Sequence, residues 1–178
     1  MDKKIEAALE KYKALIENQL ARVARMKADT GAVDYTKLDK IVIGVCGGDG
    51  IGPVITNEAH RVLEYLLQDE VKKGRIEFKV IDGLTIENRV KANKAIPDDV
   101  LAELKKCDVI LKGPTTTPRA GDPWPNIESA NVAMRKELDL FANVRPVKVP
   151  DKGIDWTFFR ENTEGAYTLG SCGLNVDD

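Results

Sequence analysis

The stretch Ile41–Pro53, IVIGVCGGDGIGP, joins a short apolar run to a glycine-rich turn. A continuous apolar run of this length is typical of a buried parallel strand. The helical pattern of Val54–Leu67 follows it, and Pro53 suits the first turn of a helix because its missing N–H would have no partner there. The stretch therefore predicts a strand, a turn and a helix.

Further elements alternate in the same way along the chain. Ile76–Ile81 alternates as a strand, Pro97–Lys106 opens with a proline and two acids that suit a helix start, and Asp108–Leu111 is another apolar strand. Strands and helices at this spacing predict βαβ units in an open α/β sheet. Ligands of such sheets bind beyond the carboxyl ends of the strands, where the turns 47–53 and 112–118 both lie.

The glycine turn has two interpretations. Its glycines would let the backbone approach a ligand closely. As a dinucleotide fingerprint the spacing is weak, because Pro53 stands where a third glycine belongs. A tight turn without a chemical role is the alternative. His60, the only histidine, lies on the following helix. We interpret it as structural, which leaves no good candidate for histidine-based catalysis.

The loop Lys112–Ile127, rich in glycine, proline and threonine, follows the third predicted strand. We expect Trp124, between two prolines, to anchor the loop, with ligand stacking as the alternative. A helix should follow from Glu128 to about Leu138, with Ser129 as its N-cap. This would place a hydroxyl and free backbone N–H groups at the anion-attracting end of a helix.

Three arginines in this part of the chain lie beside or inside apolar sequence. Arg135 shares a helical face with Asn131, Arg145 lies in a predicted strand over 140–149, and Arg160 ends one over 156–159. Guanidinium forks match carboxylate geometry bidentately. The pattern predicts a pocket for a small molecule with several carboxylates. For each arginine alone, an ordinary ion pair is the alternative.

The composition argues against several classes of function. The 178 residues are 43% hydrophobic and 31% charged, as in soluble globular proteins, and the net charge of −2 lacks the basic footprint of nucleic-acid or anionic-membrane binding. Three separated cysteines (Cys46, Cys107 and Cys172) favour neither a disulfide framework nor a zinc site. We expect no signal peptide and no membrane span, and hence a cytoplasmic protein.

Residues 2–28 contain no glycine or proline and have a helical period. A stripe recurs at spacings that alternate between four and three, and it consists of Ile5, Leu9, Tyr12, Ile16, Gln19, Val23 and Met26. Such a stripe is typical of a coiled-coil or partner-docking helix. An amphipathic helix that lies on its own domain is the alternative.

Five motifs follow one another along the chain: GDGIGP (48–53), KGPTTTP (112–118), SxNxxxR (129–135), LFANVRP (140–146) and RENTEGAY (160–167). In this order they resemble the β-decarboxylating dehydrogenases, the family of isocitrate and 3-isopropylmalate dehydrogenases. The resemblance implies an isopropylmalate dehydrogenase-like open α/β sheet with helices on both faces, incomplete in this chain. It also implies a helical extension over 1–33, the first part of the large α/β domain over 34–140, and the start of a small dimer-forming domain over 141–178.

The resemblance implies roles for single residues. Tyr167 would protonate the enolate after carbon dioxide leaves. Substrate contacts would come from Ser129, Asn131, Arg135, Arg145 and Arg160, and contacts to the nicotinamide end of the cofactor from Lys112, Thr115, Thr116 and Thr117. Within the family, a serine and an amide at 129 and 131 favour the γ-carboxylate of isocitrate, whereas leucines there would face an isopropyl group.

The implied activity is the oxidative decarboxylation of isocitrate to 2-oxoglutarate, a tricarboxylic acid cycle reaction, by a homodimer that uses NAD or NADP and Mg²⁺ or Mn²⁺. The metal ligands are expected outside this chain, which would be the N-terminal half of the enzyme and inactive alone. Alternatives are 3-isopropylmalate or homoisocitrate as substrate, a non-catalytic regulatory subunit, or an assembly module driven by the N-terminal helix. Two features depart from the family pattern: the loop Ala120–Glu128 is longer, and Ala166 replaces a frequent glutamate.

Overall fold

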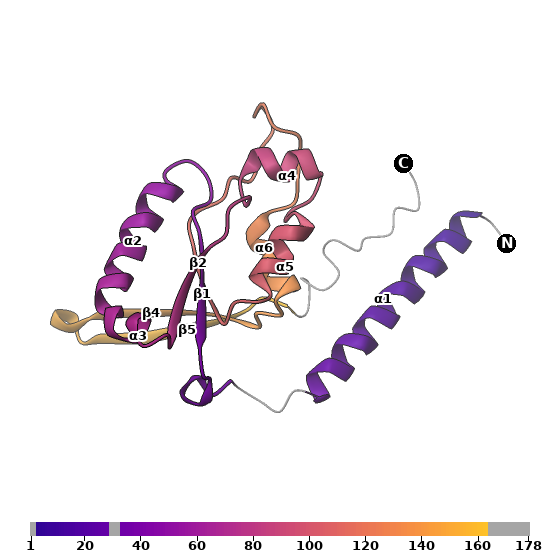
Figure 1. Cartoon of the computed structure of the whole chain (residues 1–178). Coiled ribbons are helices and arrows are strands. Elements are labelled where there is room, and N and C mark those ends of the chain that lie inside the picture. The colour runs from indigo at the N-terminus through magenta and orange to yellow at the C-terminus, as the bar shows by residue number, and fades with distance from the viewer. Residues whose placement is uncertain (1–2, 29–32, 164–178) are drawn as a thin grey trace.

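A computed structural model describes residues 3–28 and 33–163 of the chain. A parallel α/β unit forms its centre, with a long helix before it and a strand hairpin after it (Figure 1). The elements of the α/β unit are η1 (Tyr35–Lys37), β1 (Ile41–Cys46), α2 (Gly52–Leu66), α3 (Gln68–Lys72), β2 (Ile76–Val80), α4 (Ile86–Ala92), α5 (Asp98–Leu104), β3 (Val109–Lys112) and α6 (Ala130–Glu137).

The three strands of the α/β unit form one parallel sheet in the order β2-β1-β3. The register of β1 with β2 runs from Ile41↔Ile76 to Val45↔Val80, and that with β3 ends at Cys46↔Lys112. Figure 1 shows α2 on one side of the sheet and α5 and α6 on the other. The predicted open α/β sheet with helices on both faces is confirmed.

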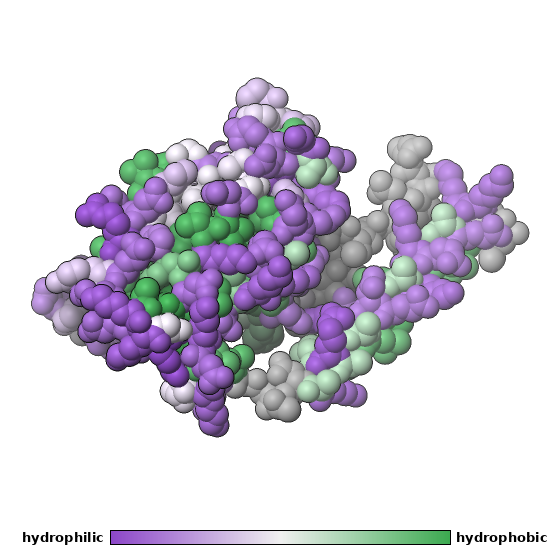
Figure 2. All heavy atoms as spheres, in the orientation of Figure 1, coloured by the Kyte–Doolittle hydropathy of each residue, from purple (hydrophilic) through white to green (hydrophobic). Residues whose placement is uncertain are grey.

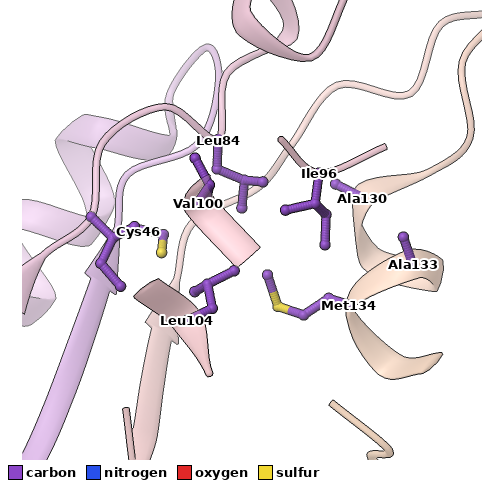
Figure 3. Close-up of a cluster of buried hydrophobic side chains, with 9 residues drawn as sticks. Cys46, Leu84, Ile96, Val100, Leu104, Ala130, Ala133 and Met134 are labelled. Carbon is purple, nitrogen blue, oxygen red and sulfur yellow. The ribbon is translucent and has the colours of Figure 1, made fainter. Parts of the chain in front are cut away.

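The core lies on the side of α5 and α6. Figure 3 shows side chains from β1, α5 and α6 pointing toward one another. The buried cluster consists of Cys46, Ile81, Leu84, Ile96, Val100, Leu104, Ala130, Ala133 and Met134. Helix α2 contributes little to a core, because only Gly52 and Thr56 of its residues are buried. The sheet is therefore well packed on one face, and apolar side chains of α2 such as Tyr65 remain exposed.

The predicted strands and long helices are confirmed to within about two residues, but two short helices were not predicted. Helix α4 begins after Thr85, whose side chain accepts a hydrogen bond from the Asn88 N–H, and ends at Asn93 in the left-handed conformation. Its seven residues give too few turns for a helical period to be recognised. Helix α3 is shorter still.

Ser129 occupies the N-cap position of α6, but its side chain makes no capping hydrogen bond. The predicted N-cap position is confirmed, but the hydroxyl does not cap the helix. The backbone starts this helix instead, since the Ala133 N–H donates to the Ser129 carbonyl over 3.0 Å. The hydroxyl is not used to satisfy its own helix.

The hairpin consists of β4 (Ala142–Val149), η2 (Pro150–Lys152) and β5 (Ile154–Glu161), and its strands pair antiparallel. Its large apolar side chains are exposed on both faces: Val144, Val147, Trp156, Phe158 and Phe159. Both faces are solvent-exposed because, among the described residues, β4 and β5 form a sheet of only two strands.

Helix α1 (Lys3–Ala28) confirms the predicted N-terminal helix. The alternative in which its stripe lies on the chain's own domain is wrong for this structure. The six apolar residues of the stripe are 41–56% exposed. The helix contacts the rest of the chain through a charged side chain, Arg22, which forms an ion pair with Asp139 at 2.9 Å.

Candidate functional site

Two loops at the carboxyl ends of β1 and β3 lie in direct contact. The Gly113 N–H donates to the Cys46 carbonyl, and the Asp49 N–H donates to the Pro114 carbonyl, each over 2.8 Å. A Cβ on Gly48, whose φ is +75°, would overlap the Pro114 carbonyl oxygen, and one on Gly113 would overlap the Gly47 carbonyl oxygen. The glycines therefore bring two protein loops together.

Asp49 connects these loops to helix α4. One carboxylate oxygen accepts from the Ile86 N–H over 2.8 Å, and the other accepts from the Thr116 N–H over 2.7 Å. Buried backbone N–H groups need such partners, and a carboxylate makes a stronger acceptor than a neutral group. The sequence analysis assigned no role to Asp49, although a lone acid between two glycines at a strand end is a usable signal.

Arg89 is the largest fully buried side chain of the described residues. Its Nε donates to the Ala95 carbonyl over 2.8 Å, and its terminal nitrogens donate to the carbonyls of Thr116 and Glu128 over 2.6 and 2.7 Å. A guanidinium fork that bonds three carbonyls fixes all three segments relative to one another. Arg89 thereby holds the threonine loop beside the start of α6. The sequence analysis missed it, because it lies in the unpredicted helix α4.

Lys112 lies half-buried at the end of β3. Its Nζ donates to the Gly113 carbonyl over 2.8 Å and to the Thr115 hydroxyl over 3.2 Å. Burial lowers the pKa of Lys112, and the positive charges of Arg89 and Arg135 lower it further, while the Cys46 thiol and the Asp49 carboxylate act in the opposite direction. Arg135 is thus close enough to Lys112 to act on its charge. Three cations, Lys112, Arg89 and Arg135, thus act on one another at this end of the sheet beside the Asp49 carboxylate, and such a group of cations favours an anionic ligand.

Helix α6 carries three of the predicted substrate residues and is anchored in the core. Ala130, Ala133 and Met134 pack into the core, so the orientation of the helix is fixed. Ser129 is half-buried, Asn131 is exposed and Arg135 is half-buried. Asn131 and Arg135, four residues apart, share one face of the helix.

The hairpin carries the other two predicted arginines. Asn143 lies opposite Arg160 in the register, and Arg145 follows two residues after Asn143 on the same face. The Nε of Arg145 donates to the Asn143 side-chain oxygen over 2.8 Å. The structure therefore brings Arg145 and Arg160 onto one face. Tyr167 lies outside the described residues.

The remaining candidates have structural surroundings. The His60 ring packs on Phe78 with ring centroids 4.6 Å apart, which supports its structural interpretation. Trp124 is half-buried in its loop. Burial raises the pKa of the Cys46 thiol to about 11, so this cysteine is a core residue and not a nucleophile.

Within residues 3–28 and 33–163, neither a metal site nor a membrane-spanning helix is formed. No three His, Cys, Asp or Glu side chains in these ranges gather into a group that could hold a metal ion. No helix there combines the length and the apolar character that a membrane span requires. A groove between α1 and the α/β unit, lined among others by Arg22, Leu104 and Asp139, contains none of the predicted site residues.

Comparison with known proteins places the chain in a family. The sequence model for isocitrate/isopropylmalate dehydrogenase matches residues 42–171. The isocitrate dehydrogenase [NADP] of Caldococcus noboribetus is 37% identical over 139 residues, which are 72% of this chain and 31% of that protein. That of Archaeoglobus fulgidus is 39% identical over 140 residues, which are 72% of this chain and 32% of that one.

Solved structures agree with this assignment. A β-decarboxylating dehydrogenase from Thermococcus kodakarensis superposes with a TM-score of 0.57 at 34% identity, over 70% of this chain and 35% of that one. Isocitrate dehydrogenase from Methylococcus capsulatus gives a TM-score of 0.53 at 30% identity, over 71% of this chain and 36% of that one. The chain spans about a third of the length of these relatives. It belongs to the isocitrate/isopropylmalate dehydrogenase family.

Proposed function

We propose that this chain forms the substrate-binding part of an isocitrate dehydrogenase that uses NADP or NAD. The observation that carries the proposal is the bridge made by Arg89, which bonds the carbonyls of Thr116 and Glu128 and so holds the loop after Lys112 beside the start of α6. A polycarboxylate placed there would gain charge-assisted hydrogen bonds. The curated relatives named isocitrate dehydrogenase [NADP] support this choice of ligand and cofactor.

Ser129 and Asn131 select the substrate in this proposal. The Ser129 hydroxyl makes no capping bond within its own helix, and the Asn131 amide is exposed. Both are therefore placed to bond the γ-carboxylate of isocitrate. An isopropyl group in the same position would leave both polar groups without partners, which costs more than a missing apolar contact.

The three arginines bind the remaining carboxylates. Arg135 acts from α6, whereas Arg145 and Arg160 act from one face of the hairpin. Asn143 orients the Arg145 fork through its Nε, so that less rotamer freedom is lost on binding. Tyr167 is proposed as the acid that delivers a proton to the enolate carbon, and positive charge nearby would lower its pKa toward the working range.

The cofactor and the metal fit the described residues to different degrees. At Gly48 and Gly113 the space on the Cβ side is occupied by the Pro114 and Gly47 carbonyls, and we assign no phosphate contact to these two positions. The nicotinamide end of the cofactor fits the described residues better. Lys112 uses two of its three N–H donors within the chain and keeps one for a ligand, and Thr115 to Thr117 lie at the carboxyl end of β3. The described residues contain no group of three His, Cys, Asp or Glu side chains that could hold a metal ion, so we assign no metal ligand to them. When bound, the cofactor supplies the hydride acceptor and the metal a Lewis acid.

Steady-state kinetics of the enzyme on isocitrate, 3-isopropylmalate and homoisocitrate, each with NAD⁺ and NADP⁺ and with Mg²⁺, tests the proposal. We expect isocitrate to give the highest kcat/KM. Asn131→Leu should lower kcat/KM for isocitrate at least about tenfold, because the γ-carboxylate would lose a hydrogen bond. Asn57→Leu is the matched control, an exposed amide on α2.

The alternatives give different results in the same assay. Highest kcat/KM on 3-isopropylmalate or homoisocitrate would contradict the assignment of isocitrate. No turnover of any of the three, together with citrate or nucleotide effects on a partner enzyme, would identify a regulatory subunit. Equal effects of the changes at 131 and 57 would show that Asn131 does not contact the substrate.

A further inference from the structure

Helix α1 lies outside the part of the chain that matches the family, which begins at residue 42. Its row of apolar side chains is nonetheless regular over almost the whole of its 26 residues. The row is exposed, with members between 41% and 56%, and Figure 2 shows green side chains along α1 beside purple ones. An isolated helix with such a row gains stability by burying it.

The chain's own contact uses another side of this helix. Arg22 pairs with Asp139, and Asn18 and Arg25 line the groove between α1 and the α/β unit, as does Gln19 at the edge of the stripe. At 3.6 residues per turn, the side chains of Arg22, Asn18 and Arg25 lie roughly 90° to 150° around the axis from the centre of the stripe. The intrachain contact thus leaves the six apolar side chains of the stripe exposed.

We propose that the stripe binds the same stripe of a second copy of this chain, as an antiparallel helix pair. The spacing assigns Leu9, Ile16 and Val23 to the a positions of a heptad, and Ile5, Tyr12, Gln19 and Met26 to the d positions. Branched, apolar side chains at the a positions of a heptad suit a two-stranded coiled coil. An antiparallel pair centred between residues 17 and 18 stacks Leu9 on Met26, Tyr12 on Val23 and Ile16 on Gln19 of the other copy.

The flanking charges select the antiparallel direction. In this register, Glu6 of each copy faces Lys27 of the other, so two opposite-charge pairs form. A parallel pair would instead place Arg22 beside Lys27 of the other copy, which repel. The helix dipoles also oppose one another favourably in the antiparallel pair.

Sedimentation equilibrium of the 178-residue chain tests the proposal. We expect a monomer–dimer equilibrium. Glu6→Lys and Lys27→Glu should each weaken it at least about tenfold, because two attractive pairs become repulsive. An equimolar mixture of the two variants should restore the wild-type affinity, since both pairs then re-form in the mixed dimer. Ala14→Lys, on the side of the helix opposite the stripe, is the control and should change nothing.

Other outcomes overturn the proposal. If the chain stays monomeric at every concentration of a 100-fold series in the micromolar range, it has no such interface. A dimer insensitive to both charge changes and to Ile16→Asp is formed by another surface. Tighter association of Lys27→Glu, with no effect of Glu6→Lys, would indicate a parallel pair. Circular dichroism of each variant would verify that α1 remains helical.

Discussion

The carboxyl end of the parallel sheet and the β4–β5 hairpin hold their functional side chains in different ways. At the sheet end, Asp49 and Arg89 bond backbone groups of three loops, and Arg89 is fully buried. On the hairpin, Arg145 is oriented by one bond to Asn143, and the aromatic side chains around it are exposed. A two-stranded hairpin is marginally stable by itself. One half of the candidate site is therefore preorganised by its own fold, and the other half depends on what covers the hairpin.

Removal of Arg89 should break the preorganised half. Arg89→Ala would leave the carbonyls of Ala95, Thr116 and Glu128 without their donor in a buried space, and we expect a loss of roughly 3–5 kcal/mol in the free energy of unfolding. Urea unfolding followed by circular dichroism measures it. Arg61→Ala, at a side chain 73% exposed, is the control and should stay within about 0.5 kcal/mol. Equal losses in both variants would show that the buried network is not what stabilises this region.

The contact between the two loops can be tested at a single glycine. Gly48→Ala adds a Cβ that overlaps the Pro114 carbonyl at a positive φ, and we expect it to cost about 2–4 kcal/mol. Gly50→Ala has a similar φ of +59° and no atom within 4 Å, so only the backbone strain of about 1 kcal/mol remains. The difference between the two unfolding free energies isolates the steric term. If the two variants unfold alike, the loops do not need their close approach.

Features with a local sequence signal could be predicted from the sequence. Strands such as Ile41–Cys46 have a local signal, an apolar run that ends in glycine, and the structure confirms them. Turn 47–53 and loop 112–118 were both placed correctly at the carboxyl end of the sheet, because topology alone puts them there. Ser129, Asn131 and Arg135 could be placed on one helix from their spacing.

The rest depends on contacts between segments far apart in the chain. Arg89 bonds carbonyls up to 39 residues away, and nothing in its neighbours marks it as buried. Asp49 bonds the backbone of residues 86 and 116, whose positions no local pattern provides. The exposure of the α1 stripe could not be predicted either, because a heptad looks the same whether a domain or another chain covers it.

A substitution on the hairpin should lower the free energy of unfolding least. Trp156 is 59% exposed, and among the described residues its ring contact is Phe158, with centroids 6.2 Å apart. Trp156→Ala should therefore cost only about 0.5–1 kcal/mol in the isolated chain. Leu104→Ala, which removes a fully buried side chain of the core, should cost roughly 2–5 kcal/mol under the same conditions. A cost for Trp156→Ala as large as that for Leu104→Ala would mean that the hairpin face is packed in solution. Arg145 and Arg160 would then be held as firmly as Lys112 and Arg135, and the two halves of the site would no longer differ in preorganisation.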